Sequence, residues 1–324
     1  MNRILLTGAS GFVGARVARL LVAQGRDVAL LLRTSSDTRR IDDFLGRCTV
    51  IRGDMDELEA VRAPIEAFRP AATVHIAWEG VKGADRDSQV HLRNVSSSIA
   101  LYQMTQALGA GRFVGLGSQA EYGPMPGRIS ESAIARPTHC YGAAKLATAL
   151  VLERSAAASG RGFAWLRLFS SYGPGDDPTW LLPYLARTLL AGEKPNVTRA
   201  EQVWDYIHVD DVARGIVAAV DARPSGVFNL GSGRALPLRQ IIETLRDLID
   251  PALPIGFGEI DYRADQVMHL EADTTALQAA TGWVPKVSIE HGLAELVAHA
   301  RQMQPVRAFV APTQSANSSE PLFP

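Results

Sequence analysis

Short apolar runs alternate with longer amphipathic stretches along most of the chain. Each apolar run ends in glycine or a polar residue, and the stretch after it repeats apolar positions at helical spacing. This alternation predicts parallel strands joined by crossover helices, in a doubly wound parallel α/β sheet. The expected strands are 3–7, 28–32, 49–52, 73–77, 112–116, 163–168, 202–209 and 226–230. The expected helices are 15–24, 57–68, 90–108, 141–159, 181–191, 211–221, 238–249 and 288–302.

A glycine-rich turn joins the first expected strand to the first expected helix. It contains Gly8, Ser10, Gly11, Phe12, Val13 and Gly14. In such a turn the first glycine permits a tight bend, the second lets backbone N–H groups approach a pyrophosphate, and the third lets the helix pack closely on the strand. Strand, turn and helix occur together, so the motif predicts dinucleotide binding. A βα turn without a ligand is the alternative.

Two polar residues follow the second and third expected strands, at the sheet edge where such folds bind ligands. Arg33 suits the 2′-phosphate of NADP, whereas an acid at this position would accept a hydrogen bond from the ribose of NAD. We therefore expect NADP, with NAD possible; a solvated charged loop is the alternative. Asp54 either accepts a hydrogen bond from adenine or caps the following helix. The polar, glycine-containing segment 79–88 is a candidate lid.

Tyr141 and Lys145 stand at positions i and i+4 of an expected helix, on one face and one turn apart. A phenol titrates near pH 10, and an ammonium beside it favours the phenolate and lowers that pKa. The pair therefore predicts an acid/base group that works near neutral pH. The same spacing arises by chance in many chains, so a surface tyrosine with a solvated lysine is the alternative.

The composition is that of an ordinary globular protein. The chain has 324 residues, 47% of them hydrophobic and 21% charged, and a net charge of −1, so no nucleic-acid or membrane partner is expected. Cys48 and Cys140 lie far apart without a metal-binding spacing, which indicates a reducing compartment and no metal. No signal peptide or membrane-spanning run is evident, and we expect a cytoplasmic protein. Residues 306–324 are rich in Pro, Ser, Thr and Asn and have no hydrophobic period, so we expect them to form a tail outside the fold.

Together these residues resemble the extended short-chain dehydrogenases/reductases, and within them the sugar-nucleotide epimerases, dehydratases and reductases. The resemblance covers residues 1 to about 299 and implies a Rossmann domain at 1–170, to which 202–230 returns. It implies a smaller mixed α/β substrate-binding lobe at 171–201 and 231–305. The motifs that carry it are Gly8–Gly14, Gly53-Asp54, His75-Ile76-Ala77, Asn94-Val95, Gly117–Gly123, Tyr141–Lys145, Leu166–Phe169, Tyr172–Gly175 and Asp205–Asp211.

The resemblance also implies roles for individual residues. Tyr141 would be the acid/base on a sugar oxygen, Lys145 would bind the nicotinamide ribose, and Ser118 would hydrogen-bond the same sugar oxygen. Two donors aimed at an oxygen that gains negative charge stabilise it. The implied cofactor contacts beyond the glycine turn are Arg33, Asp54, Met55, Ala77, Asn94, Tyr141, Lys145 and Phe169. The implied substrate contacts are Trp78, Gln119, Ser170, Arg234 and Arg263, with Arg263 ranked first for the diphosphate; a solvated arginine is the alternative.

One departure from the family pattern narrows the expected reaction. Dehydratases of this family carry an Asp-Glu pair directly after the Ser118 position, whereas this chain has Gln119 and Ala120, which cannot exchange a proton. The remaining expected reaction is oxidation or reduction of the sugar without loss of water. Arg33 favours an NADP-dependent ketoreductase of an NDP-4-keto-6-deoxyhexose. The alternatives are a 4-epimerase with tightly bound NAD and a non-catalytic dinucleotide-binding regulator. The resemblance further implies a homodimer, formed through the helices around Asn94 and Tyr141.

Overall fold

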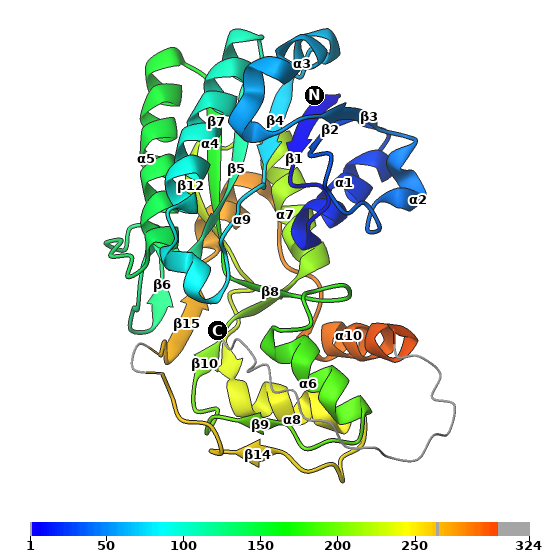
Figure 1. Ribbon diagram of the computed structural model, residues 1–324. Helices are drawn as coiled ribbons and strands as arrows, with labels where there is room; N and C mark the ends of the chain where they lie inside the picture. Colours follow the sequence, from blue (N-terminus) through cyan, green and yellow to red (C-terminus); the bar gives the residue numbers. More distant parts are fainter. Residues whose placement is uncertain (1, 264–265, 304–324) are drawn as a thin grey trace.

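The computed structural model describes residues 2–263 and 266–303, and the predicted tail lies outside them. A seven-stranded parallel sheet forms the centre of the molecule, in the order β12-β7-β5-β4-β1-β2-β3 (Figure 1). The predicted doubly wound sheet is therefore confirmed. Its strands are β1 (Arg3–Thr7), β2 (Asp27–Leu32), β3 (Thr49–Arg52), β4 (Ala72–His75), β5 (Arg112–Ser118), β7 (Gly162–Leu168) and β12 (Gly226–Leu230).

Helices cover both faces of this sheet (Figure 1). On one face lie α1 (Phe12–Ala23) and α7 (Val209–Ala222); on the other lie α3 (Arg62–Phe68), α4 (Val90–Ala107) and α5 (Cys140–Ser159). Successive side chains of a strand point to opposite faces. Ile4 and Leu6 accordingly join the core under α1 and α7, whereas Leu5 joins the core under α4 and α5. Burial on both faces explains why these strands read as continuous apolar runs.

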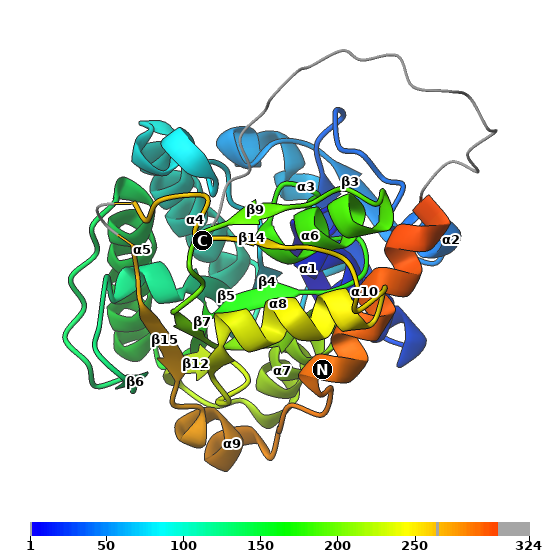
Figure 2. The same ribbon diagram turned by 90° about the horizontal axis from the view of Figure 1, so that it is seen from below.

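A second group of helices faces the carboxyl edge of the sheet. Here α6 (Leu181–Leu190), α8 (Leu238–Asp247) and α10 (Ile289–Met303) pack around an apolar core of their own (Figure 2). Short strands complete this region. They are β6 (Arg128–Ile129), β8 (Ser170–Tyr172), β9 (Asn196–Val197), β10 (Val203–Trp204), β11 (Tyr206–His208), β13 (Leu236–Pro237), β14 (Gly256–Phe257) and β15 (His269–Ala272).

Four short helical elements were not predicted as such. They are α2 (Asp42–Leu45), η2 (Gly83–Asp87), η3 (Gln119–Glu121) and α9 (Thr275–Thr281). The expected helix 57–68 is in fact a 3-10 helix, η1 (Met55–Val61), followed by α3, with a non-helical Glu57 inside the first. No helix of the described residues is long and apolar enough to cross a membrane.

The expected strand 202–209 is divided by Asp205. This carboxylate is fully buried and accepts hydrogen bonds from the backbone amides of Ser232, Gly233 and Ala272, at 2.8, 2.9 and 3.0 Å. As a result β10 joins the four-stranded sheet β13-β10-β15-β6, while β11 pairs with β8. The chain thus changes sheets at a polar residue that an apolar pattern could not reveal.

Candidate active site

The turn between β1 and α1 is built from glycines because the backbone approaches itself closely there. Gly8 has a φ of +76°, and a β-carbon on it would lie 2.6 Å from the nitrogen of Ala77. A β-carbon on Gly14 would lie 2.0 Å from the carbonyl oxygen of Gly8. The backbone requirements predicted for Gly8 and Gly14 are therefore present, and they bring the start of α1 against the ends of β1 and β4.

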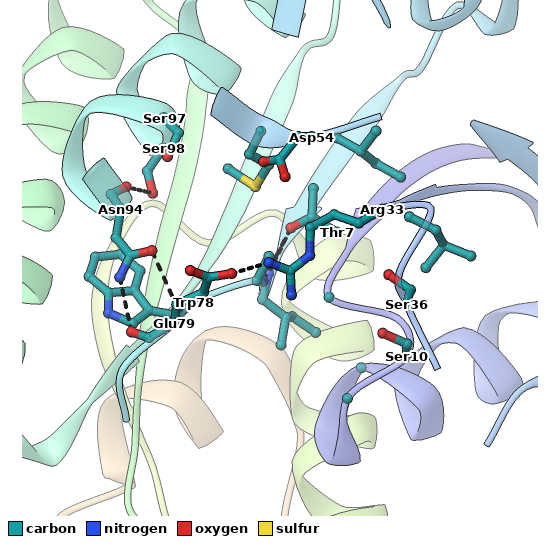
Figure 3. A pocket seen from close by; sticks show the side chains of 18 of the residues that line it. Thr7, Ser10, Arg33, Ser36, Asp54, Trp78, Glu79, Asn94, Ser97 and Ser98 are labelled. Carbon is teal, nitrogen blue, oxygen red and sulfur yellow. Dashed lines mark hydrogen bonds and ion pairs between the residues drawn. The ribbon is translucent and has the colours of Figure 1, made fainter. Parts of the chain in front are cut away.

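A cavity of about 480 Å³ lies over this turn (Figure 3). It is within the size range of small-molecule sites. A glycine-lined turn, the N-terminus of a 12-residue helix and the ends of four parallel strands are the features that accept a dinucleotide phosphate group. The residues present therefore fit the cofactor. The predicted cofactor residues in the wall are Gly8, Ser10, Gly11, Phe12, Val13, Gly14, Arg33, Asp54, Met55, Ala77 and Asn94.

Arg33 extends from the end of β2 into this cavity and forms an ion pair with Glu79, from the segment after β4 (Figure 3). Arg93 lies 3.9 Å from the second Glu79 oxygen. The charge expected to select NADP is thus matched by a carboxylate that the sequence analysis did not single out. The nearby Arg39 and Arg40 line a different cavity, beside α6 and α10, and Arg40 also lines the cavity that contains Tyr141.

Two further predicted cofactor residues have structural partners as well. The Asp54 carboxylate accepts a hydrogen bond from the Asp56 amide at 3.1 Å, so it caps η1 while it also lines the cavity. The Asn94 side chain bonds both backbone groups of Glu79, at 3.0 Å to its carbonyl oxygen and 3.4 Å to its nitrogen. Asn94 thereby fixes the segment that carries the acid facing Arg33.

The predicted catalytic residues meet in a second cavity, of about 530 Å³, between the sheet and the helices of the second group. Ser118 ends β5, while Tyr141 and Lys145 come from the first turns of α5. The other predicted residues in its wall are Trp78, Gln119, Phe169, Ser170 and Arg263. The two cavities share six wall residues, Phe12, Val13, Ile76, Trp78, Val81 and Leu116, and are therefore adjacent.

Four predicted contacts differ from expectation. Tyr141 and Lys145, predicted to touch the cofactor as well, line the second cavity and, among the described residues, not the first. Arg234 and Phe169 are the other two. Arg234 is exposed and is not among the described residues that line either cavity, because its loop is held back by the Ser232 contacts to Asp205. Phe169, predicted to touch the cofactor, lies in the wall of the second cavity and, among the described residues, not in that of the first. It follows β7 directly and packs with Trp204 in a small apolar core.

Lys145 is buried, with 3% of its surface exposed. Its ammonium donates a hydrogen bond to the carbonyl oxygen of Leu116 at 2.5 Å and lies 3.8 Å from the centre of the Trp78 ring. Burial disfavours the charged form and lowers the pKa of Lys145 to about 7, while the Glu121 carboxylate opposes this. The side chain is thus poised to exchange a proton near neutrality.

Tyr141 is partly buried, and its ring contacts those of Trp78 and His91, with centres 6.5 and 5.7 Å apart. Burial raises the pKa of Tyr141; a hydrogen bond with the Ser118 side chain and the Arg86 charge work in the opposite direction. The predicted lowering of this pKa by Lys145 is therefore wrong for this structure, because desolvation outweighs the neighbouring charges. A phenol with a raised pKa is protonated at neutral pH and is suited to donate its proton.

Glu121 is a buried residue of the site that the sequence analysis missed. It is fully buried, and one carboxylate oxygen accepts hydrogen bonds from the Ser118 amide and from the indole of Trp165, both at 2.9 Å. The other accepts from the guanidinium of Arg167 at 2.7 Å. Ser118 and Glu121 form a capping box on η3. The Ser-x-x-Glu spacing, a known capping signature, could have identified it. Its effect is to fix the backbone of Ser118.

The two positions after Ser118 carry no ionisable group. Gln119 and Ala120 both line the second cavity as part of η3. An amide and a methyl group cannot act as the acid and base that remove water from a sugar. The cavity is therefore equipped for proton transfer at Tyr141 but not for dehydration through these two positions.

Fold and site together define a Rossmann-type dinucleotide-binding protein with a serine–tyrosine–lysine set beside the cofactor cavity. The chain belongs to the NAD dependent epimerase/dehydratase family, whose model matches residues 4–231. This confirms the resemblance to the sugar-nucleotide branch of the extended short-chain dehydrogenases/reductases.

Relatives of known activity align along nearly the whole chain. A UDP-glucose 4-epimerase of Corynebacterium glutamicum is 27% identical over 305 residues, which cover 88% of this chain and 91% of the relative. A dTDP-glucose 4,6-dehydratase of Streptomyces griseus is 28% identical over 313 residues, 92% of this chain and 93% of the relative. The solved UDP-glucose 4-epimerase of Thermotoga maritima with UDP-glucose has a TM-score of 0.82 and 26% identity, over 93% and 99% of the two chains.

Proposed function

We propose that this protein is an NADP-preferring oxidoreductase of nucleotide sugars that reduces the 4-keto group of an NDP-4-keto-6-deoxyhexose. The observation that carries the proposal is the meeting of Ser118, Tyr141 and Lys145 in one cavity that adjoins the dinucleotide cavity. Relatives that act on nucleotide sugars support the substrate class. A non-catalytic regulator would have no need of this set of proton-transfer groups.

The chemistry of the step would be divided between cofactor and protein. A bound nicotinamide supplies the hydride. The Ser118 hydroxyl and the Tyr141 phenol would hold the carbonyl oxygen of the sugar as negative charge develops on it. Tyr141 would then give that oxygen its proton. Burial keeps the pKa of Tyr141 above its usual value, so the phenol holds the proton that reduction requires. Lys145 would hold the cofactor ribose.

The polar wall of the second cavity supports a diphosphate-linked substrate. Arg263 lines this wall together with Gln119 and Ser170. A guanidinium grips phosphate through paired hydrogen bonds, so Arg263 would hold the diphosphate. The absence of ionisable side chains at Gln119 and Ala120 speaks against dehydration. Reduction without loss of water is the reaction that these residues support.

A 4-epimerase with tightly held NAD is the second candidate. The ion pair between Arg33 and Glu79 favours it, because a paired arginine offers less to a 2′-phosphate. The epimerase relatives favour it as well. An epimerase oxidises and re-reduces the same carbon, so it needs no net supply of reduced cofactor.

One pair of assays separates the two candidates. Stoichiometric oxidation of NADPH with dTDP-4-keto-6-deoxyglucose would support the ketoreductase. Interconversion of UDP-glucose and UDP-galactose by the purified protein without added cofactor would instead support the epimerase. If neither reaction occurs with a panel of nucleotide sugars, while the Tyr141→Phe variant binds the same cofactor, the proposed function is wrong.

We further propose that the protein is a homodimer whose subunits meet through α4 and α5, which pack side by side (Figure 1). Three large apolar side chains on these helices are exposed: Leu92 by 70%, Leu150 by 53% and Val151 by 43%. Covering such side chains is favourable by about 25 cal/mol per Å². Light scattering should give twice the mass of one chain, and Leu150→Glu should shift it towards the monomer. A monomeric parent protein would refute this proposal.

A further inference from the structure

Arg86 lies in η2, on the loop after β4, and its guanidinium carbon is 5.5 Å from the centre of the Tyr141 ring. Both side chains line the second cavity. We propose that Arg86 is a charge partner of the proton-donating phenol, and that its guanidinium stabilises the negative charge that Tyr141 carries once its proton has left. This inference rests on the proposed function, in which Tyr141 exchanges a proton with the substrate.

The position of Arg86 is set by the next residue. The Asp87 carboxylate lies 3.0 Å from Nδ1 of His139 through one oxygen and accepts a hydrogen bond from the Cys140 amide, at 2.9 Å, through the other. Cys140 is the first residue of α5, and Tyr141 is the second. The loop that carries Arg86 is therefore fastened to the start of the helix that carries the phenol.

The other end of this loop is held by Lys82. Its ammonium forms an ion pair with Asp177 and lies 5.8 Å from the centre of the Trp180 ring. Both partners belong to the segment that leads into α6. The segment 82–87 is therefore held at both ends, and its Lys82 and Arg86 side chains line the second cavity, with Arg86 over the Tyr141 ring.

Arg40 and Arg263 also line the second cavity, but the guanidinium that lies over the Tyr141 ring is that of Arg86. Lys145, one turn further along α5, does not supply a lasting positive charge. Lys145 directs its ammonium to Leu116 and Trp78, and its pKa of about 7 means that it loses its charge near neutrality. Nε2 of His91 donates to the Asp85 carbonyl oxygen and Nδ1 accepts from the Trp78 indole, so both ring nitrogens have partners other than Tyr141.

Glu121 is negative and works against the phenolate, and the Ser118 hydroxyl is uncharged. Arg86 keeps its charge throughout the working pH range, because a guanidinium in a protein does not deprotonate. It lowers the pKa of Tyr141, against the larger effect of burial. A cation above an aromatic ring is attracted to the ring itself, and more strongly once the ring bears a negative charge.

The test compares Arg86→Gln and Arg86→Lys by ultraviolet difference titration of phenolate, with Tyr141→Phe subtracted to isolate one of the 7 tyrosines. We expect Arg86→Gln to move the titration of Tyr141 to higher pH and to lower kcat at neutral pH about tenfold. Arg86→Lys keeps a positive charge, so the titration of Tyr141 and kcat should both stay close to the parental values. An unchanged titration in Arg86→Gln would overturn the inference.

A matched control distinguishes the effect of the Arg86 charge from the effect of the position of the loop. Lys82→Gln removes the other cation of this loop and its contact to Asp177, and should leave the phenolate titration where it is. If Lys82→Gln moves the titration as far as Arg86→Gln, loop position and not the guanidinium is responsible, and the inference fails. The titration needs no substrate, so it tests Arg86 even if the proposed ketoreductase activity is not found. A thermal unfolding transition at the parental temperature verifies that each variant is folded.

Discussion

The guanidinium of Arg33 and the carboxylate of Glu79 form an ion pair at the dinucleotide cavity, between the ends of two different strands (Figure 3). Both side chains are about half exposed, at 52% and 45%. An exposed pair of this kind contributes about 0.2–1 kcal/mol. In the proposed NADP complex, the 2′-phosphate would have to compete with Glu79 for Arg33, so the carboxylate would weaken the preference for NADP.

Removal of that competition is expected to sharpen the choice of cofactor. Glu79→Gln should raise the affinity for NADPH by up to about fivefold, which corresponds to the upper strength of an exposed pair, and leave NADH affinity nearly unchanged. Arg33→Asp should lower NADPH affinity more than NADH affinity. Fluorescence titration with both cofactors measures each Kd. Equal effects of Arg33→Asp on the two cofactors would mean that this arginine does not contact the 2′-phosphate.

Loss of the phenol should abolish turnover without loss of the cofactor. Tyr141→Phe keeps the ring, and with it the contacts to Trp78 and His91, but removes the proton. We expect kcat to fall by about 10²–10⁴, the usual contribution of a general acid, with an unchanged Kd for NADPH. Turnover at the parental rate would refute the assignment of Tyr141.

Lys145 is expected to destabilise the fold in a pH-dependent way. Its pKa falls from 10.5 to about 7 on burial, so between these values the unfolded chain binds a proton that the folded chain does not. Stability linked to this group therefore increases as pH rises from about 7 towards 10.5, and is lowest below 7. Lys145→Met should raise the Tm most at pH 6, while it abolishes activity.

The comparison of that variant with the parent across pH provides the check. The difference in Tm should shrink steadily as pH approaches 10, since the parent then folds without giving up a proton. Differential scanning calorimetry at several pH values measures this directly. A Tm difference that does not depend on pH would show that Lys145 keeps its charge in the folded protein.

The close approach at the glycine turn gives a further prediction. In Gly14→Ala the new β-carbon would meet the Gly8 carbonyl oxygen at 2.0 Å, and α1 has to move away from β1. Overpacking of this kind costs about 1–3 kcal/mol, and we expect cofactor affinity to fall with it. Gly46→Ala is the matched control, because Gly46 has a φ of −64° and open space around it. Urea unfolding should show a lower free energy of unfolding for Gly14→Ala and an unchanged one for Gly46→Ala.

Much of this fold could be read from the sequence because the large sheet is buried on both faces. Its strands are continuous apolar runs and its helices keep an apolar face, so local patterns reflect the tertiary structure. The same logic places Ser118 and Arg33 at strand ends, and both line cavities. The pattern failed at 202–209, where the buried carboxylate of Asp205 directs the chain between two sheets.

The electrostatics of the site could not be predicted in the same way. The position of Glu79 opposite Arg33, of Glu121 behind Ser118 and of Arg86 beside Tyr141 depends on how loops pack in three dimensions. The direction of the Tyr141 pKa depends on burial, which the spacing of two residues on a helix does not contain. Sequence identified Ser118, Tyr141 and Lys145 as candidate proton-transfer groups, but the charges around them required the structure.

The indole of Trp78 borders both the dinucleotide cavity and the neighbouring one, and the Lys145 ammonium rests on its face. The protein thus carries an intrinsic optical reporter where the two cavities adjoin. Of the five tryptophans, Trp78 lines both cavities, whereas Trp180 and Trp204 line the second cavity and not the first. A molecule that enters the first cavity should therefore be followed through Trp78 by stopped-flow emission without an attached dye.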